Sequence, residues 1–354
     1  MSETSHLRAA ESSPPRKRTR VETDSGITNE VKRESFTRDE KFWYDDGNIV
    51  VVAEDVGFRL YKGLLARQSD VFRDMFDLPQ PASDGSRDDA LVDCAVVHVA
   101  DSPAEIRSLL RVLLDGRRYM QRFDIDFEDV ANCIRLGHKY AIMDLLEDSM
   151  REFKCYFPVD FKSWDTKYEL PKPIHPVVAV NLARLTNTPS ILPAALYLCC
   201  QMDGAELSSC AYTGDSRNAV SQVDLARCIN GKAKLCTRAA HMIREIFAPI
   251  ENASCSVSDN RCKLSLSEKQ LEWSNASELD GRDCDLLRSW GSYIRRHDRK
   301  IRPKPASPMC ASCIAALCQR EKAVRKGLWS DLPELCGLEK DDEDKSTDGS
   351  EHSG

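Results

Sequence analysis

Two short apolar segments on either side of a turn, close to residue 50, constrain the fold of this chain most. Residues 48–53 read Asn-Ile-Val-Val-Val-Ala and are rich in β-branched side chains, and residues 58–62 alternate apolar with polar side chains. Glu54-Asp55-Val56-Gly57 is the expected turn between them. This pattern predicts a β-hairpin. The part of the chain that we expect to be ordered therefore begins with β-structure.

A helix, a third strand and a second helix are expected next. Apolar side chains four positions apart predict a helix over 69–76, and the β-branched run at 94–99 predicts a strand. Ser102 and Glu105, with a proline directly after the serine, form the pattern of a capping box. The helix that starts there carries a leucine-rich stripe and ends at Gly116.

From residue 127 onward every expected element is a helix. The apolar stripes and breaks in the chain place these helices at 127–138, 142–153, 176–186, 190–202, 223–230, 232–247, 268–278, 285–295 and 309–328. A Cys-, Ser- and Asn-rich stretch at 251–263 interrupts them. The expected fold class is therefore α+β, with an all-α C-terminal region.

Both ends of the chain are polar and lack apolar periodicity, which predicts disordered tails at 1–40 and 339–354. The C-terminal tail is acidic. The N-terminal arm contains the basic cluster Arg16, Lys17, Arg18 and Arg20 after two prolines. Such a cluster is a candidate nuclear-import signal, and the alternative is a solvated charge run without a function.

Net charge and hydropathy exclude several classes of function. The chain has 57 acidic and 50 basic residues and a formal charge of −7, which argues against direct binding to nucleic acid or to a membrane surface. The longest apolar stretch, 191–200, is interrupted by Pro193 and is shorter than the roughly 20 residues that span a bilayer. Because the N-terminus has no apolar signal region, we expect the protein in the nucleus or the cytoplasm.

The chain contains 15 cysteines, which in a reducing compartment are expected to be free thiols or metal ligands. Cys310 and Cys313 have the Cys-x-x-Cys spacing of a metal-binding pair, and Cys255 and Cys262 are candidates for the second pair of a structural Zn²⁺ site. The alternative is that the first pair belongs to an apolar helix stripe. Other cysteines in apolar stripes are expected in the core; these are Cys199, Cys200, Cys228 and Cys236.

Motifs that carry catalysis are not found in the sequence. Gly231-Lys232 lacks the first glycine of a phosphate-binding loop, and no zinc-protease, nucleophile-elbow or dinucleotide pattern occurs. A thiol or metal-dependent enzyme in the C-terminal half remains the alternative from another class. The sequence favours a protein that is not an enzyme and has no certain cofactor.

Residues 42–154 resemble the BTB/POZ domain in their order of elements and in three segments, at 46–52, 58–76 and 113–116. The whole chain is also similar to a group of fungal BTB proteins with a helical C-terminal half, on the stretches 188–197 and 328–335. Tyr61 stands where the family usually has histidine. The resemblance implies five regions: an arm (1–40), a BTB/POZ domain (41–154), a helical region (155–250), a helical region with the cysteine pairs (251–338) and an acidic tail (339–354).

The resemblance implies a protein that binds proteins. The expected partners are a second copy of the chain, giving a dimer, or a cullin scaffold of a ubiquitin ligase, for which the chain would act as an adaptor. Tyr119, Met120 and Phe123 are candidate partner-binding anchors, and the alternative is that they fold back onto the domain. Asn48 replaces an aspartate that forms an ion pair in transcription-factor members. A nuclear transcriptional regulator that recruits partners through the BTB domain is the second functional hypothesis.

Overall fold

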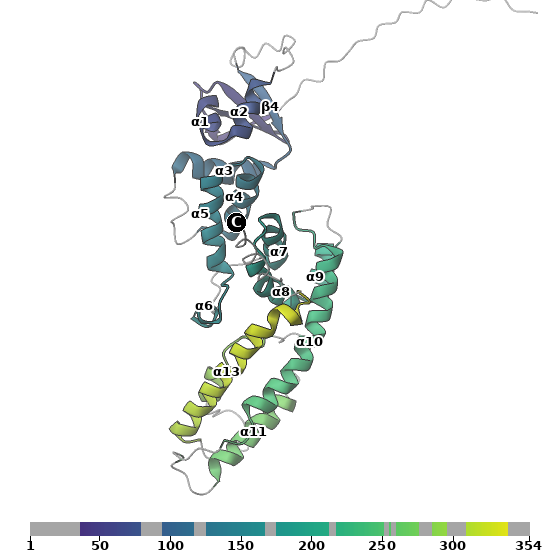
Figure 1. The fold of residues 1–354 in the computed structure, drawn as a ribbon. Helices are drawn as coiled ribbons and strands as arrows, with labels where there is room; N and C mark the ends of the chain where they lie inside the picture. The colour runs from purple at the N-terminus through teal and green to yellow at the C-terminus, as the bar shows by residue number, and fades with distance from the viewer. Residues whose placement is uncertain are drawn as a thin grey trace, which may run out of the picture.

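The computed structural model describes residues 36–78, 94–116, 125–166, 175–211, 217–250, 255, 260–275, 285–295 and 309–338. Over these residues the predicted α+β class is confirmed, because a four-stranded sheet is followed by helices alone. Figure 1 shows an elongated molecule, with the sheet at one end and a pair of long helices, α10 and α13, extending toward the other.

The sheet has the strand order β1-β3-β2-β4. Its strands are β1 (Thr37–Trp43), β2 (Ile49–Ala53), β3 (Val56–Leu60) and β4 (Ala95–Val99). The predicted hairpin is confirmed, since β2 and β3 pair antiparallel, but its turn is shorter than expected because Val56 already pairs with Ala53. All residues of β2 are buried, which accounts for its unbroken apolar run.

Strand β1 is not predicted by the sequence, and its first residues lie in the expected disordered arm. The predicted boundary at residue 40 is wrong, because β1 begins at Thr37 and pairs parallel with β3. Asp39 faces inward, where its carboxylate accepts hydrogen bonds from Arg107 Nε at 2.7 Å and from the backbone N–H of Phe42 at 2.9 Å. A buried aspartate interrupts the apolar alternation by which a strand is recognised.

Five helices complete the sheet-containing part: α1 (Lys62–Gln68), α2 (Asp70–Asp77), α3 (Pro103–Asp115), α4 (Phe127–Lys139) and α5 (Met143–Tyr156). The predicted capping box is confirmed. Ser102 Oγ accepts from the N–H of Glu105, and Glu105 Oε2 accepts from the N–H of Ser102 at 2.9 Å. Ser69 caps α2 and also donates to the carbonyl of Tyr140 at 2.5 Å, which fixes α2 to the end of α4.

The helical half contains α6 (Phe161–Thr166), α7 (Pro176–Leu185), α8 (Leu192–Gln201), α9 (Gly204–Ala211), α10 (Gln222–Ile246), α11 (Arg261–Asn275), α12 (Gly291–Arg295) and α13 (Ala311–Leu335). A 3₁₀ turn, Pro189–Ile191, leads into α8. Helices α6 and α9 are not predicted by the sequence. One continuous apolar core runs from Phe42 in the sheet to Cys336 at the end of α13, so the two halves share a core.

Helix α10 corrects the predicted break at Gly231. The sequence predicts two helices there, 223–230 and 232–247, whereas the structure has a single helix of 25 residues. A Cβ at Gly231 would lie 2.9 Å from Cys200 Sγ of α8. The glycine therefore serves the close approach of α8 and α10, and the helix tolerates it because the packing compensates for its low helix propensity.

The last three helices also differ from their predicted bounds. Helix α11 begins at Arg261, inside the stretch expected to be irregular. The predicted helix 285–295 is helical only from Gly291, because the N–H groups of Leu287 and Trp290 donate to Tyr197 Oη and Glu321 Oε1, at 2.9 and 2.7 Å. Helix α13 passes the predicted end at 328 and continues through Pro333.

Within the described part of the chain, no helix has both the length and the apolar character needed to cross a membrane. The acidic tail at 339–354 and the arm up to residue 35 lie outside the described residues.

Candidate metal centre

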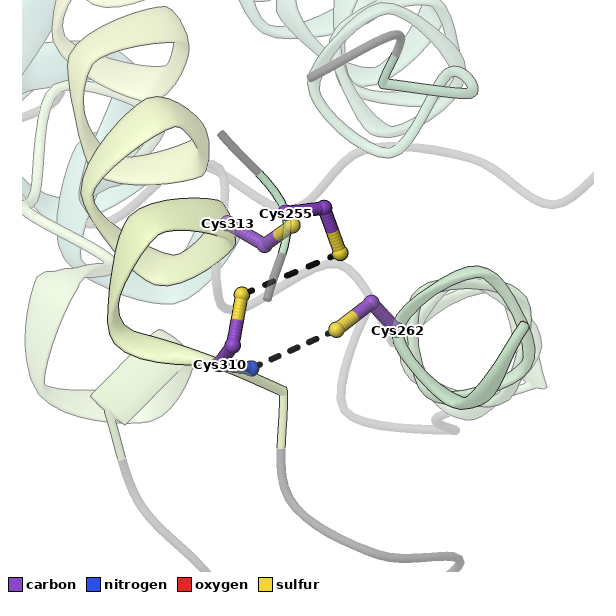
Figure 2. A group of neighbouring side chains, drawn as sticks. All are labelled: Cys255, Cys262, Cys310 and Cys313. Carbon is purple, nitrogen blue, oxygen red and sulfur yellow. Dashed lines mark hydrogen bonds between the residues drawn. The ribbon is translucent and has the colours of Figure 1, made fainter. Parts of the chain in front are cut away.

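Four cysteines from distant parts of the sequence lie together beside the start of α13. Their sulfur atoms are all within 4.8 Å of one another. Cys310 directly precedes α13, and Cys313 lies in the first turn of that helix. Cys262 lies in the first turn of α11, and Cys255 belongs to the segment between α10 and α11. Figure 2 shows the four side chains directed toward a common centre. The two sequence pairs are thus neighbours in space.

The contacts within this cysteine cluster are those of sulfur atoms that are close but not bonded. Cys310 Sγ lies 3.9 Å from Cys255 Sγ, whereas a disulfide bond is about 2.05 Å long. The backbone N–H of Cys310 donates to Cys262 Sγ at 3.3 Å (Figure 2). Cys262 and Cys313 are buried, and Cys255 and Cys310 are half-buried. Two of the four candidate ligands are therefore shielded from water, and the other two are partly shielded.

Two opposing effects act on the charge of the cysteine cluster. Helix α13 has 25 residues, and Cys310 and Cys313 lie at its N-terminal end, where the backbone N–H groups and the helix dipole stabilise thiolates. Burial raises the pKa of the Cys262 thiol, as do the thiols of Cys255 and Cys310, and this outweighs the lowering by the backbone N–H of Cys310 and by the Cys313 thiol. The arrangement can hold a soft cation that four sulfur ligands surround.

A second group of cysteines lies at the opposite end of α13, and its chemistry is different. As the sequence predicts, Cys199, Cys200 and Cys228 are buried in the core, and Cys336 joins them from the C-terminal end of α13. Cys200 Sγ donates to the carbonyl of Cys228 at 3.4 Å. Thiol hydrogen bonds to Cys228, together with burial, raise the pKa values of Cys199 and Cys200 far above the ordinary thiol range. Cys199 and Cys200 are therefore neutral core thiols, and the same hydrogen bonds lower the pKa of Cys228, whose sulfur accepts them.

The prediction that Cys236 belongs to the core is wrong, because its side chain is exposed. The buried side of α10 runs through Cys228, Gly231, Leu235 and Ala239. Cys236 follows Leu235 directly and is turned by about 100° from this stripe, because a helix has about 3.6 residues per turn.

The remaining candidate residues lie outside the described part of the chain. These are the partner-binding candidates Tyr119, Met120 and Phe123 and the nuclear-import candidates Arg16, Lys17, Arg18 and Arg20. Asn48 and Tyr61, at which the chain departs from the BTB pattern, are both described. Asn48 Oδ1 accepts from the backbone N–H of Lys62 at 2.7 Å, and Tyr61 Oη donates to Asp46 at 2.6 Å. Both side chains thus fasten the strand ends beside α1.

A groove that the sequence does not reveal lies between α3 and α4 on one side and α7 and α9 on the other. Its volume is about 660 Å³, and Arg217 lines it. Arg217 Nη1 donates to Glu105 Oε2 at 2.8 Å and to Ser102 Oγ at 3.2 Å. This ion pair joins the capping box of α3 to the helical half. No local pattern could have predicted it, since 112 residues separate Arg217 from Glu105.

No protein-family model matches the chain, and no curated protein matches it.

Proposed function

We propose that this protein is a non-enzymatic adaptor or scaffold. In this proposal the sheet-containing domain, of BTB/POZ type, binds one protein or a second copy of the chain, and the helical half presents another partner. The cullin scaffold of a ubiquitin ligase is the first partner to be tested. The observation that carries the proposal is the single apolar core shared by both halves of an elongated chain (Figure 1). A scaffold needs such rigidity, because it must hold two partners at a fixed separation.

The ion pairs between elements support the same proposal. Among the described residues, the buried carboxylates of Asp39, Asp101, Glu105, Asp129, Asp224 and Glu321 each contact an arginine or lysine of this chain. A carboxyl group that acts as a general acid or base must be able to reach a substrate and exchange protons with it. Five of these six carboxylates are paired with a residue of another segment and hold the two together, whereas Glu321 is paired with Arg325 of its own helix, α13. Their arrangement is what a structural role requires.

Affinity capture of the full chain from cells of its source tests the proposal. We expect a cullin among the captured proteins, and we expect it to be lost when Tyr119, Met120 and Phe123 are changed together to alanine. The matched control changes three exposed apolar residues of the helical half, Val223, Ile229 and Leu271, and should retain the cullin. Circular dichroism and thermal unfolding establish that both triple variants are folded. Capture of copies of this chain alone would contradict the adaptor and leave a self-assembling scaffold.

The second candidate function is a nuclear regulator that recruits transcriptional partners through the same domain. The basic cluster Arg16, Lys17 and Arg18 favours it, because import receptors bind short basic runs of this kind. Changing these three residues to alanine should move a fluorescent fusion of the chain from the nucleus to the cytoplasm. An unchanged distribution would show that these residues are not an import signal, and the second candidate function would lose its support.

A further inference from the structure

We propose that Cys255, Cys262, Cys310 and Cys313 bind one Zn²⁺ ion in a tetrahedral four-thiolate site, which fastens α11 and the segment before it to the start of α13. The inference is independent of the adaptor proposal, since it concerns a different part of the molecule. It is carried by the mutual closeness of four sulfur atoms that come from three separate segments of the chain.

The spacing of the sulfur atoms fits a single zinc ion. A tetrahedron with Zn–S bonds of about 2.3 Å has sulfur atoms about 3.8 Å apart. The distance between Cys255 Sγ and Cys310 Sγ is 3.9 Å, and no pair in the cluster exceeds 4.8 Å. A cluster of four irons needs a wider cage, because each cysteine then binds a different iron. The observed cage suits one ion at its centre.

The sequence spacing agrees with the spatial arrangement. Cys310 and Cys313 form a Cys-x-x-Cys pair at a helix N-terminus, so that both sulfur atoms can reach one ion, as in structural zinc sites. Figure 2 shows Cys262 on α11 facing the start of α13, and Cys255 comes from a separate segment before α11. Together the two pairs supply the four ligands that structural zinc requires.

The surroundings compensate for the charge of the proposed centre. Four thiolates around Zn²⁺ carry a net charge of −2, which the positive N-terminal end of α13 offsets in part. The N–H···S hydrogen bond from Cys310 to Cys262 Sγ, at 3.3 Å, acts as an outer contact that orients a ligand sulfur.

The packing of α11 explains what the ion would do. Among the described side chains of α11, only Cys262, Ser265 and Leu266 are buried, while Leu264 and Leu271 are exposed. One buried leucine is little apolar contact for residues 261–271, the part of α11 whose side chains the structure describes, because ordering each residue costs conformational entropy. Zinc would provide the missing attachment, as it does in small domains whose cores are too small to fold without metal.

Metal analysis of the purified full chain tests the inference. The chain is prepared under reducing conditions with a purification tag that does not bind metal. Mass spectrometry of the elements should find about one zinc ion per chain and no stoichiometric iron. Cys310→Ser should lose at least about tenfold in zinc affinity, measured by competition with a chelating dye, because one of four ligands is gone. The matched control Cys318→Ser changes a half-buried cysteine of the same helix outside the cluster and should keep the full zinc content.

A second measurement does not depend on how well the variants fold. Wild-type chain, stripped of metal and loaded with Co²⁺, should show intense sulfur-to-cobalt absorption in the near ultraviolet and tetrahedral bands in the red. Hydrogen exchange at 260–266 and 310–315 should rise when zinc is removed. The inference is overturned by stoichiometric iron, by wild-type chain without zinc and without the cobalt spectrum, or by equal zinc loss in Cys310→Ser and Cys318→Ser.

Discussion

Two groups of four cysteines lie near the two ends of the α10–α13 helix pair, and they differ in nearly every physical respect. In the group of Cys199, Cys200, Cys228 and Cys336, the side chains are buried among apolar residues, and thiol hydrogen bonds together with burial raise the pKa values of Cys199 and Cys200. In the cluster of Cys255, Cys262, Cys310 and Cys313, the sulfur atoms surround one point at a helix N-terminus. We call these the core group and the zinc cluster.

The comparison teaches that the number of cysteines in one place does not determine their role. A metal site requires that all sulfur atoms reach a common centre, and among the described residues only the zinc cluster achieves this. The core group instead fills space between α8, α10 and the end of α13, where a thiol behaves as a small apolar side chain. One end of the helix pair is thus held by packing, and the other is the end at which we propose zinc.

The largest expected effect concerns Arg325, which lies on α13 between the two groups. Its guanidinium is buried and donates to Glu321 Oε1 and to Asp165 Oδ1 of α6, each at 2.7 Å. Arg325→Ala leaves both carboxylates without their buried partner, so chemical denaturation should show a loss of about 3–5 kcal/mol in the free energy of unfolding. The control Lys322→Ala removes an exposed partner of Asp165 and should cost about 0–1 kcal/mol. Equal losses in the two variants would contradict the buried network.

Gly231→Ala separates packing at the core group from metal binding at the zinc cluster. Alanine normally stabilises a helix interior relative to glycine, but here its Cβ would lie 2.9 Å from Cys200 Sγ. We expect a loss of about 1–3 kcal/mol in unfolding free energy, with unchanged zinc content.

The double variant Gly231→Ala, Cys200→Ala removes the sulfur atom from this contact and should recover part of the loss, which a double-mutant cycle measures. If the free-energy changes of the two single substitutions simply add in the double variant, the steric contact with Cys200 is not the cause of the loss in Gly231→Ala.

Lowering the pH should have a smaller effect on the free energy of unfolding. We expect the effect at Asp224, which lies on α10 one turn before Cys228 of the core group. Burial would raise the pKa of Asp224, but hydrogen bonds from Arg184, Arg227 and Ser221 outweigh it and hold the pKa below its usual value of 3.8. A carboxyl group with a lowered folded-state pKa stabilises the fold above its unfolded-state pKa, and this contribution is lost as the pH falls through the folded-state value.

Denaturation measured from pH 6 down to pH 3 should therefore show falling stability, with a shallower slope in Asp224→Asn. The same slope in both proteins would exclude Asp224 as a source of the acid sensitivity.

The smallest effect is expected for Cys236→Ser. Because this side chain is exposed, the unfolding free energy should change by no more than about 0.5 kcal/mol. Cys199→Ser, by contrast, buries a hydroxyl group in the core group and should cost about 1–3 kcal/mol. Thermal unfolding under reducing conditions distinguishes them, and equal shifts would show that the two sites do not differ in burial as described.

Local elements of the fold could be predicted because local interactions determine them. The hairpin follows from β-branched runs on either side of a turn, and the start of α3 follows from the capping box of Ser102 and Glu105. Strand β1 could not be predicted in this way, because its inward position at Asp39 is stabilised by Arg107 of α3. The predicted break at Gly231 failed for a related reason, since the space that the glycine leaves is filled by α8.

For the candidate site, the sequence by itself indicated one candidate ligand pair, Cys310 and Cys313 at a helix start, because a spacing of three residues places both sulfur atoms on one side of a helical turn. It proposed Cys255 and Cys262 as the second pair without establishing that they approach the first. The tertiary structure decided that question across 48 residues, by packing α11 against the beginning of α13. Periodicity and caps are short-range properties of a chain, whereas a common centre for four sulfur atoms exists only after the helices have packed.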